Sequence, residues 1–522
     1  MGLCTSLLLS RLDVQSLLVE RHPKTSIHPR ARGLNVRTME LLRVWGLEDQ
    51  VRIAGRPLEN ATDVVWAESL AGSERRRVPA GGRRDNLLAV SPTTGCACAQ
   101  DELEPVLLAN ARSYRVGSIA FDHEVVAFEQ AQDSVTARVR DRKTDEEIIV
   151  RAQYLVAADG AESAVRQALG ASTSGPGVLN QQIGIYAKAE LGALVAKRPA
   201  ALYFINNPNV SGLMAAVNND DRWVFYTDRP VSWDDATGGM PLESSVAVFR
   251  LAAGVPDLDV RVLNVLPWSM AAQTADRFCF DRALLAGDAA HVIPPVGGYG
   301  MNTGIQDAHN LAWKLAGVLK GWADPSLLQT YEVERLPVAR FVTEQALLNM
   351  RQPGRPEQYS TLGLALGVSY ESAAVVSDGT SAPPVTNPVI DYVPTARPGS
   401  RAPHVWLEQG AERVSAIDLF DTSFTLIAGS SGQNWCDAAV AIAGDLGIPI
   451  KAYRVGNEGE LRDPQESLGA LYGIDIDGAV FVRPDGHIAW RSASGASTPE
   501  RVLRHAIRAV VGKEQSPSPA KS

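Results

Sequence analysis

The chain has 522 residues, 45% of them hydrophobic and 21% charged, a composition typical of a soluble globular enzyme with about three domains. Its 50 basic and 59 acidic side chains give a net charge of −9, which disfavours nucleic acid or an anionic membrane as a partner and leaves a small-molecule substrate open. The apolar run Leu3–Leu9 is too short to span a bilayer and has no basic segment before it, so neither a signal peptide nor a membrane anchor is expected, and a cytoplasmic location is the default.

The chain begins like the second half of a dinucleotide-binding βαβ unit. A short helix (Leu3–Leu12) precedes an apolar β-run (Val14–Val19) that ends in Glu20. A carboxylate at the tip of this strand can bind both hydroxyls of an adenosine ribose, although a solvated loop acid is the alternative. Such a unit normally opens with a buried strand and a G-x-G-x-x-G turn, of which only Gly2 has a counterpart here.

The first half of the chain alternates β-like and helical segments, as α/β layering requires. Met39, Leu42 and Leu47 are spaced for a helix that follows a polar loop, and a second helix is predicted from Gln100, with acids in its first turn. The five cysteines form no disulfide ladder. The one close pair, Cys96 and Cys98, is better explained as two small buried thiols than as metal ligands, so no metal is predicted.

Residues 175–274 have a different pattern, in which β-like segments are separated by Asn, Asp and Gly turns. This pattern predicts an antiparallel sheet inserted into the nucleotide-binding domain. Before the insert, the strand "YLVAADG" ends in Asp159 and Gly160, where open α/β sheets bind ligands. A helix N-cap is the alternative role for Asp159.

After the insert, "ALLAGDAAH" again ends a buried strand, at Gly287 and Asp288. A loop with two prolines and three glycines follows and leads into a helix predicted over Asn302–Lys320, with Gly321 available as its stop. A Gly-rich loop at a helix N-terminus offers free N–H groups and a positive dipole to an anion. A sugar-alcohol chain held by Asp288 and an anionic ring at the helix terminus would describe a flavin, and a purely structural turn is the alternative.

With these motifs the sequence resembles the flavin-dependent aromatic hydroxylases of the para-hydroxybenzoate hydroxylase fold, most of all the polyketide hydroxylases of the tetracenomycin type. The likeness covers nearly the whole chain, and the stretches that carry it include "LLVERHPKTSIHPRARGLNVRTMELLR", "QDELEPVLLANAR", "YLVAADGAESAVR" and "LLAGDAAHVIPPVGGYGMNTGIQDAHNLAWKLAGVL". It implies a Rossmann-like FAD-binding domain, an inserted antiparallel β-sheet substrate domain and a C-terminal thioredoxin-like α/β domain.

The resemblance also implies one non-covalent FAD, with Glu20 on the adenosine ribose, Arg32 and Gln100 along the cofactor, and Asp159 near the pyrophosphate. Asp288 would hold the ribityl chain, and the amides of 301–302 would meet the C2 carbonyl of the flavin. The residues that would flank the flavin ring are Pro295, Gly297 and Gly298. The full set expected at the cofactor is Gly2, Glu20, Arg21, Arg32, Gln100, Asp159, Gly160, Gly287, Asp288, Pro295, Gly297, Gly298, Gly300, Met301 and Asn302.

The implied activity is that of a monooxygenase that takes electrons from NADPH or NADH and oxygen from O2, and hydroxylates an aromatic polyketide or polycyclic phenol through a flavin C4a-hydroperoxide. Simple phenols or ansamycin antibiotics are the alternative substrates. Water must be excluded from such a site, and the β-rich insert would supply the apolar cover. Its candidate pocket residues, for each of which a place in the core is the favoured alternative, are Tyr203, Phe204, Trp223, Phe225 and Trp268. No catalytic base is assigned, and His291 is expected to be structural.

The last part of the chain resembles the thioredoxin fold, with Trp435 and Cys436 in the loop that would read W-C-x-x-C. The second cysteine is absent, so the domain cannot cycle through an internal disulfide. We therefore expect a redox-inert packing or dimerisation domain, and a homodimer is one expected state. The expected boundaries are 1–174 and 275–350 for the FAD-binding domain, 175–274 for the substrate domain, 351–399 for a linker, 400–513 for the thioredoxin-like domain and 514–522 for a disordered tail.

The absence of the phosphate loop has two possible explanations. Met1 is expected to be an internal methionine of a longer protein, because everything downstream is locally consistent, whereas a genuine variant with weakened FAD binding is the alternative. Loss of the first strand would leave an apolar groove in the sheet. The same absence supports a functional hypothesis other than the two enzyme activities above. In it, the chain is a catalytically inactive subunit that binds a polyketide or a partner without FAD.

Overall fold

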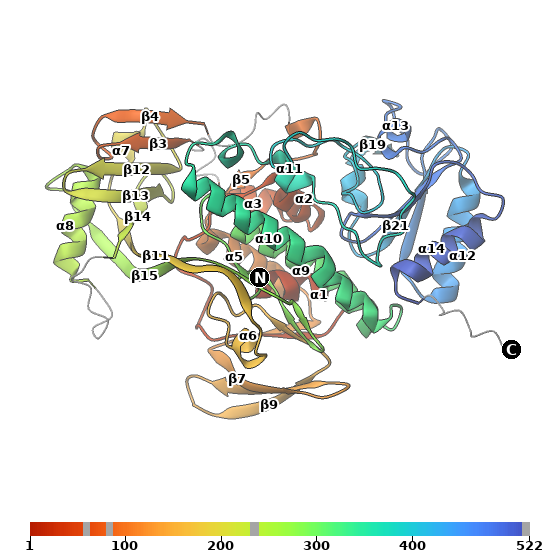
Figure 1. The fold of residues 1–522 in the computed structure, drawn as a ribbon, viewed down its shortest axis with the longest axis horizontal. Coiled ribbons are helices and arrows are strands. Elements are labelled where there is room, and N and C mark those ends of the chain that lie inside the picture. Colours follow the sequence, from red (N-terminus) through yellow and green to blue (C-terminus); the bar gives the residue numbers. More distant parts are fainter. Residues whose placement is uncertain (56–62, 80–86, 230–239, 514–522) are drawn as a thin grey trace.

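The computed structural model describes residues 1–55, 63–79, 87–229 and 240–513. Figure 1 shows a helical α/β centre, a broad sheet on one side, a small β-lobe below and a second α/β unit on the other side. The expected disordered tail, 514–522, lies outside the described residues. No helix in the described ranges is both long and apolar enough to cross a membrane.

The centre is built from short strands, some paired in parallel and some antiparallel, that lie between helices. Its elements are α1 (Gly2–Arg11), β1 (Ser16–Glu20), β2 (Gly33–Leu34), α2 (Val36–Val44), α3 (Glu48–Gly55), β5 (Cys96–Ala97), α5 (Gln100–Ser113), β6 (Gly117–Phe121), β10 (Leu155–Ala157), α6 (Ala164–Ala168), β16 (Cys279–Phe280), β17 (Ala283–Leu285), α9 (Gly300–Leu319) and α10 (Gln329–Arg351). β1 pairs in parallel with β6, and β10 pairs in parallel with β17. In the described part of the chain no strand joins β1 to β10, so the sheet is in two pieces.

Apolar residues of α1, α2, α5 and α9 form the core of this centre, including Leu8, Leu41, Leu107 and Leu311. α9 is almost wholly buried, and both α1 and α10 pack against it. The prediction of a long helix after the Gly-rich loop is confirmed, with its start two residues earlier than expected. Gly321 follows it with φ +77°, the left-handed conformation that ends helices.

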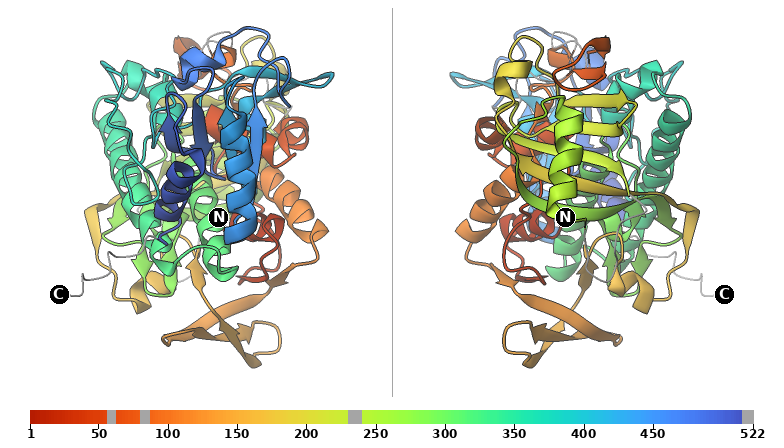
Figure 2. Two further views of the ribbon diagram at one scale, coloured as in Figure 1. Left: turned by 90° about the vertical axis from the view of Figure 1, so that its right-hand side faces the viewer. Right: turned by 90° about the vertical axis from the view of Figure 1, so that its left-hand side faces the viewer.

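The broad sheet has eight strands in the order β18-β15-β11-β14-β13-β12-β3-β4. The strands are β3 (Val64–Ala67), β4 (Glu74–Val78), β11 (Thr173–Lys188), β12 (Leu202–Asn207), β13 (Val210–Ala216), β14 (Arg222–Asp228), β15 (Arg261–Ala275) and β18 (His291–Val292). One face packs on α7 (Gly192–Val195) and α8 (Leu242–Ala253), and Figure 2 shows α8 lying across it. β3 and β4 come from outside residues 175–274, so the sheet draws on more of the chain than the sequence pattern indicated.

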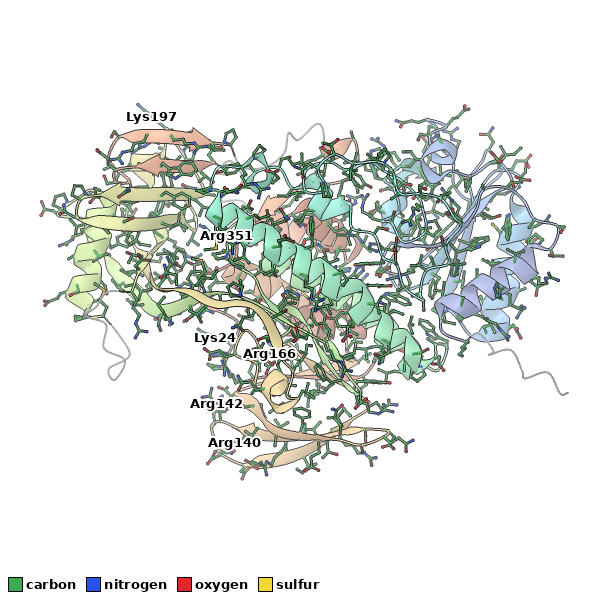
Figure 3. All side chains as sticks on the ribbon, viewed as in Figure 1. Lys24, Arg140, Arg142, Arg166, Lys197 and Arg351 are labelled. Atoms are coloured by element: carbon green, nitrogen blue, oxygen red, sulfur yellow. The ribbon has the colours of Figure 1, made fainter. Side chains whose placement is uncertain are left out.

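The lower lobe is a three-stranded antiparallel sheet of β7 (His123–Gln130), β8 (Val135–Asp141) and β9 (Glu147–Ala152). The predicted hairpin strands of this region are therefore present, but the second is split into β9 and β10. Figure 3 shows Arg140 and Arg142 on this lobe, where Arg140 pairs with Glu147 at 2.8 Å on the solvent side. Such exposed pairs contribute little to the stability of a fold, because water and salt screen them.

The C-terminal unit is a four-stranded mixed sheet in the order β22-β21-β23-β24 with helices on its faces. Its elements are β19 (Trp406–Gln409), β20 (Glu412–Ser415), β21 (Phe424–Ala428), α12 (Gln433–Leu446), β22 (Ile450–Arg454), α13 (Leu468–Tyr472), β23 (Ala479–Val482), β24 (Ile488–Ser492) and α14 (Pro499–Val510). The segment expected as a linker contains α11 (Leu362–Leu366), whose residues 363–366 are buried.

Trp435 and Cys436 lie in the first turn of α12 and not in a loop, because the helix begins at Gln433. Both side chains are buried in the core of the C-terminal unit, and burial raises the pKa of the Cys436 thiol to about 11. A protonated, enclosed thiol is a poor nucleophile. This environment supports the expectation of a packing role for the unit.

Three buried histidines are expected to make the protein acid-sensitive. Burial lowers the pKa of His28 and His404 to about 4 and that of His309 to about 3. Below pH 6.5 the unfolded chain takes up protons at these histidines while the folded chain does not. The free energy of unfolding therefore falls as the pH is lowered, by up to about 1.4 kcal/mol per pH unit for each group. Urea unfolding at pH 6.5, 5.8 and 5.0 measures this slope. His404→Gln should make the slope shallower by about one histidine's share, and an unchanged slope would contradict the expectation.

Candidate functional site

A cavity of about 4060 Å³ lies between the helical centre and the broad sheet. Ligand sites for single small molecules are typically about 300–1,000 Å³, so this one has room for a large cofactor together with a substrate. Fourteen of the fifteen residues predicted at the cofactor line it, and the exception, Gly287, lies directly behind Asp288. The fold therefore brings together side chains that are far apart in the sequence. Among residues 1–55, 63–79, 87–229 and 240–513, no group of three His, Cys, Asp or Glu side chains is arranged to bind a metal.

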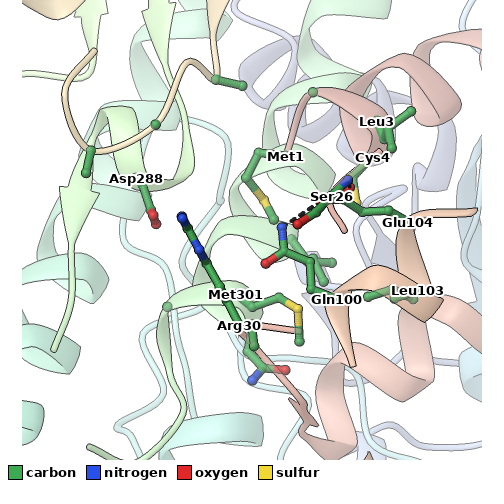
Figure 4. A pocket seen from close by; sticks show the side chains of 18 of the residues that line it. Met1, Leu3, Cys4, Ser26, Arg30, Gln100, Leu103, Glu104, Asp288 and Met301 are labelled. Atoms are coloured by element: carbon green, nitrogen blue, oxygen red, sulfur yellow. Dashed lines mark hydrogen bonds between the residues drawn. The ribbon is translucent and has the colours of Figure 1, made fainter. Parts of the chain in front are cut away.

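Asp288 stands at the end of β17, in the short 3-10 turn Gly287–Ala289. Gly287 has φ +60°, which lets the chain turn sharply there. The carboxylate opens into the cavity, and Figure 4 shows the Arg30 side chain directed toward it. The surrounding protein raises the pKa of Asp288, while His291 and Arg30 oppose the rise. Arg30 was not among the predicted site residues, although it belongs to the basic "HPRARG" stretch.

A buried ion network holds this turn in place. The Asp307 carboxylate accepts hydrogen bonds from Gly287 N at 3.1 Å, from Arg335 Nε at 2.7 Å and shares one of 2.6 Å with His291 Nε2. Burial alone would raise the pKa of Asp307, but His291 and Arg335 lower it. Arg335 also donates to the Thr303 carbonyl at 3.0 Å. The network thus couples the Asp288 turn to the first turns of α9, and it gives His291 a structural partner, as expected.

The loop before α9 presents free backbone amides to the cavity. Gly297 (φ +106°) and Gly298 (φ +70°) shape it, and the first bonded amide is that of Thr303, which donates to Tyr299 O at 2.9 Å. The amides of 300–302 precede this bond and have no acceptor within the helix. Three such groups together with the helix dipole make an anion site.

The Asn302 side chain fixes this loop to the start of α2. Its Oδ1 accepts from Asn35 N at 2.9 Å and from Thr38 Oγ1 at 2.7 Å, and its Nδ2 donates to Gly33 O and Gly298 O, both at 2.9 Å. Asn35 is itself the N-cap of α2. Only the backbone of Asn302 was expected at the cofactor, whereas its side chain also joins two cavity-lining segments.

At the other end of the cavity lie Gly2, at the N-terminus of α1, and Glu20, at the tip of β1. Glu20 Oε1 accepts a hydrogen bond from the backbone amide of His22 at 2.9 Å, and it shares another of 2.6 Å with Nδ1 of the His22 ring. Asp159 lines the cavity and accepts from Ser163 Oγ at 2.5 Å and from Val165 N at 3.1 Å, so it also bonds the first turn of α6, whose N-cap is Ser163. Gly160 beside it has φ +86°.

The remaining predicted side chains divide into two groups. Gln100 Nε2 donates to Glu104 at 2.6 Å on the cavity wall, and Arg21 is exposed. Arg32, in contrast, is enclosed and donates to the carbonyls of Ala201, at 3.3 Å, and Ala216. Burial lowers the pKa of its guanidinium. Arg32 therefore ties the 28–34 loop to the broad sheet at the cavity wall.

The predicted pocket aromatics lie on opposite faces of the broad sheet. Phe204 and Trp268 line the cavity. Tyr203, Trp223 and Phe225 are 1%, 0% and 0% exposed in the core under α8, so these three do not line it. The physical reason is strand alternation, because neighbouring residues point to opposite faces. Trp66 and Tyr226, which were not among the predicted pocket residues, also lie on the cavity face.

Comparison with known proteins assigns both the N-terminal and the C-terminal part of the chain to families found in flavin-dependent hydroxylases. Residues 1–346 match the family described as an FAD binding domain, and residues 395–513 match the aromatic-ring hydroxylase C-terminal family. The tetracenomycin A2 monooxygenase-dioxygenase of Streptomyces glaucescens is 38% identical over 547 residues, covering 98% of this chain and 95% of that protein. Among solved structures, the flavin-dependent monooxygenase PieE with FAD and substrate superimposes with a TM-score of 0.90 at 32% identity, covering 98% and 97% of the two chains. Aklavinone-11 hydroxylase with FAD and aklavinone gives 0.83 at 35% identity with the same coverage.

Proposed function

The chain belongs to the FAD-dependent aromatic-ring hydroxylases, and we propose that it hydroxylates an aromatic polyketide or a similar polycyclic phenol, with NADPH or NADH as reductant and O2 as oxidant. The observation that supports this most is the composition of the cavity. One side of the cavity is a broad apolar wall that includes Phe204, Tyr226 and Trp268. Asp288 and the free amides at the start of α9 also face the cavity. The similarity to aklavinone-11 hydroxylase, solved with FAD and aklavinone, and to a polyketide hydroxylase of Streptomyces halstedii supports the same substrate class.

The residues around the cavity fit FAD. Asp288 offers an open carboxylate to the hydroxyls of the ribityl chain, and the amides of 301–302 offer donors to a carbonyl of the flavin ring. Gly298 has no atom within 4 Å of the position where a Cβ would stand, so the loop leaves space for a flat ring beside it. The N-terminus of α1, at Gly2, is available to the diphosphate, and Glu20 to the adenosine ribose.

When bound and reduced by NADPH or NADH, FAD supplies the chemistry that activates O2, one atom of which enters the aromatic ring while the other leaves as water. The protein's share is binding and shielding. The α9 terminus would stabilise negative charge on a bound flavin ring, because its amides and dipole are already oriented. The apolar wall of the broad sheet covers the substrate and keeps water away. No side chain is assigned as a base.

The test is a comparison of NADPH and NADH oxidation by the FAD-loaded chain with and without a hydroxylated anthraquinone as probe. We expect the probe to accelerate oxidation and the product to gain one oxygen atom, derived from labelled O2, by mass spectrometry. Hydrogen peroxide measured in the same reaction reports uncoupled turnover. Failure of any aromatic probe to accelerate oxidation in a chain that holds FAD would contradict the proposal and favour a binding role.

Asn302→Ala is expected to weaken FAD binding about tenfold, because the loop that carries the free amides loses its attachment to α2. Loss of side-chain hydrogen bonds among buried partners should also lower the free energy of unfolding by about 2 kcal/mol. Equilibrium dialysis of FAD against the apoprotein measures the first effect and urea unfolding the second. Asn110→Ala is the control, since Asn110 bonds to Gln50 and Val106 on the exposed side of α5. Equal behaviour of the two variants would contradict the role given to Asn302.

A further inference from the structure

The register of the broad sheet aligns seven residues in a single row across its cavity face. Each residue is paired directly with the next on the neighbouring strand. From β15 to β4 the row reads Leu266, Gly184, Tyr226, Leu213, Phe204, Trp66 and Arg76. The first six line the cavity, and the seventh is exposed on β4, the edge strand.

The middle of the row is an aromatic platform. The rings of Phe204 and Trp66 are stacked, with centroids 5.2 Å apart and planes 13° apart. A Cβ on Gly184 would lie 3.1 Å from Tyr226 Cε1, so the Tyr226 ring covers the space left by the glycine. Strands lie about 4.8 Å apart, and the three strand steps from Tyr226 to Trp66 therefore span about 14 Å. A flat ligand of three or four fused rings can contact the whole of this platform.

The platform ends in a positive charge. The Arg76 guanidinium lies 4.9 Å from the centre of the Trp66 ring. Its neighbours on β4 are neutralised, Arg75 by Glu68 at 3.1 Å and Arg77 by Asp63 at 2.7 Å. No carboxylate pairs with Arg76 within the described ranges. A cation stacked on an indole keeps its N–H groups available at the edge, where a carboxylate can bind two of them.

The opposite side of this end of the cavity is also polar. A Cβ on Gly354 would lie 3.2 Å from a guanidinium nitrogen of Arg76, so the segment after α10 passes close to the charge. Tyr359, from the same segment, lines the cavity, and its buried hydroxyl has no hydrogen-bond partner among the described residues. An unpaired buried hydroxyl and an unpaired guanidinium at one end of an aromatic platform indicate a place for an anionic oxygen group.

We propose that Arg76, Trp66 and Tyr359 form a specificity subsite that binds a carboxylate on the outer ring of a flat polycyclic aromatic substrate. The inference rests on the proposed function, since it places the substrate of that reaction in the same cavity. The ring system lies along the row from Tyr226 to Trp66, and its carboxylate end meets Arg76 at the edge strand. The charge selects among polycyclic substrates, whereas the stacked rings bind all of them.

The test compares two probes that differ only at one outer ring, an anthraquinone with a carboxylate there and the same anthraquinone with a hydroxymethyl group. Dissociation constants are measured on the FAD-loaded full chain without reductant. We expect the carboxylate to bind about tenfold more tightly, and Arg76→Gln to remove that preference while the affinity for the neutral probe stays within about twofold. Arg76→Lys should restore part of the preference. Trp66→Leu should weaken both probes.

Arg75→Gln is the matched control, because Arg75 is the adjacent arginine on the same strand but pairs with Glu68. It should change neither affinity. Equal affinity of the unchanged chain for the two probes would overturn the subsite, as would an equal effect of Arg76→Gln and Arg75→Gln. Binding is measured without NADPH, so the subsite can fail while substrate-stimulated oxidation succeeds. If oxidation fails while the carboxylate preference is present, the proposed function fails alone.

Discussion

Replacement of Asp288 by alanine is expected to weaken FAD binding by about 100-fold, so that the purified chain is colourless under conditions in which the unchanged chain is yellow. The reason is the position of the carboxylate, which opens into the cavity beside the loop before α9. Charge-assisted hydrogen bonds to two ribityl hydroxyls are worth about 1.5–3 kcal/mol each, so the loss of both corresponds to a factor of 100 or more.

The same substitution should not destabilise the apoprotein. Asp288 is exposed to the cavity, and within the described residues its carboxylate accepts no hydrogen bond that alanine would remove. Absorbance of retained FAD after gel filtration and thermal unfolding of the apoprotein together separate a binding effect from a folding effect. Asp288→Asn, which keeps an oxygen acceptor, should lie between alanine and the unchanged chain. A yellow Asp288→Ala chain with undiminished FAD would contradict the assignment.

The parts of the site that could be predicted from the sequence are those encoded locally. Gly287, Asp288 and the Gly-rich loop precede α9 within one continuous stretch, and a strand, a turn and a helix N-terminus follow from the order of apolar residues, glycines and prolines. Asp159 illustrates the limit of such local reasoning. Its position after β10 was predicted, but a strand tip does not reveal that the side chain also bonds the first turn of the next helix, whose N-cap is Ser163.

Contacts between distant strands could not be predicted in the same way. Alternation identifies two faces of a strand but does not say which one packs on α8, and three of the five predicted pocket aromatics are on the packed face for that reason. Trp66 joins the cavity wall only because β3 pairs with β12, more than a hundred residues away. Asp307 did leave a signal that was not used, since a carboxylate inside an apolar helix stretch needs a buried partner.

The C-terminal unit is attached to α9 and α10 through a buried cluster of charges. Arg483 donates to both oxygens of Glu334, at 2.6 and 2.8 Å, and Lys314 donates to Glu334 at 2.7 Å. Asp485, from the same turn as Arg483, accepts from Trp313 Nε1 at 3.2 Å. Burial alone would raise the pKa of Glu334, but Arg483 and Lys314 hold it far below its usual value. The cluster therefore depends on complete charge compensation.

Arg483→Met is accordingly expected to lower the free energy of unfolding by about 3–5 kcal/mol, because it leaves Glu334 and Asp485 buried with too little positive charge. Urea unfolding followed by tryptophan fluorescence and by far-UV circular dichroism measures the loss. Arg504→Met, which removes an exposed pair with Glu500 and Asp445, should cost less than about 1 kcal/mol. Similar losses for the two variants would contradict a structural role for the cluster.

Because α9 runs from this cluster to the amides at residues 300–302, we also expect Arg483→Met to weaken FAD binding, and Arg504→Met to leave it unchanged.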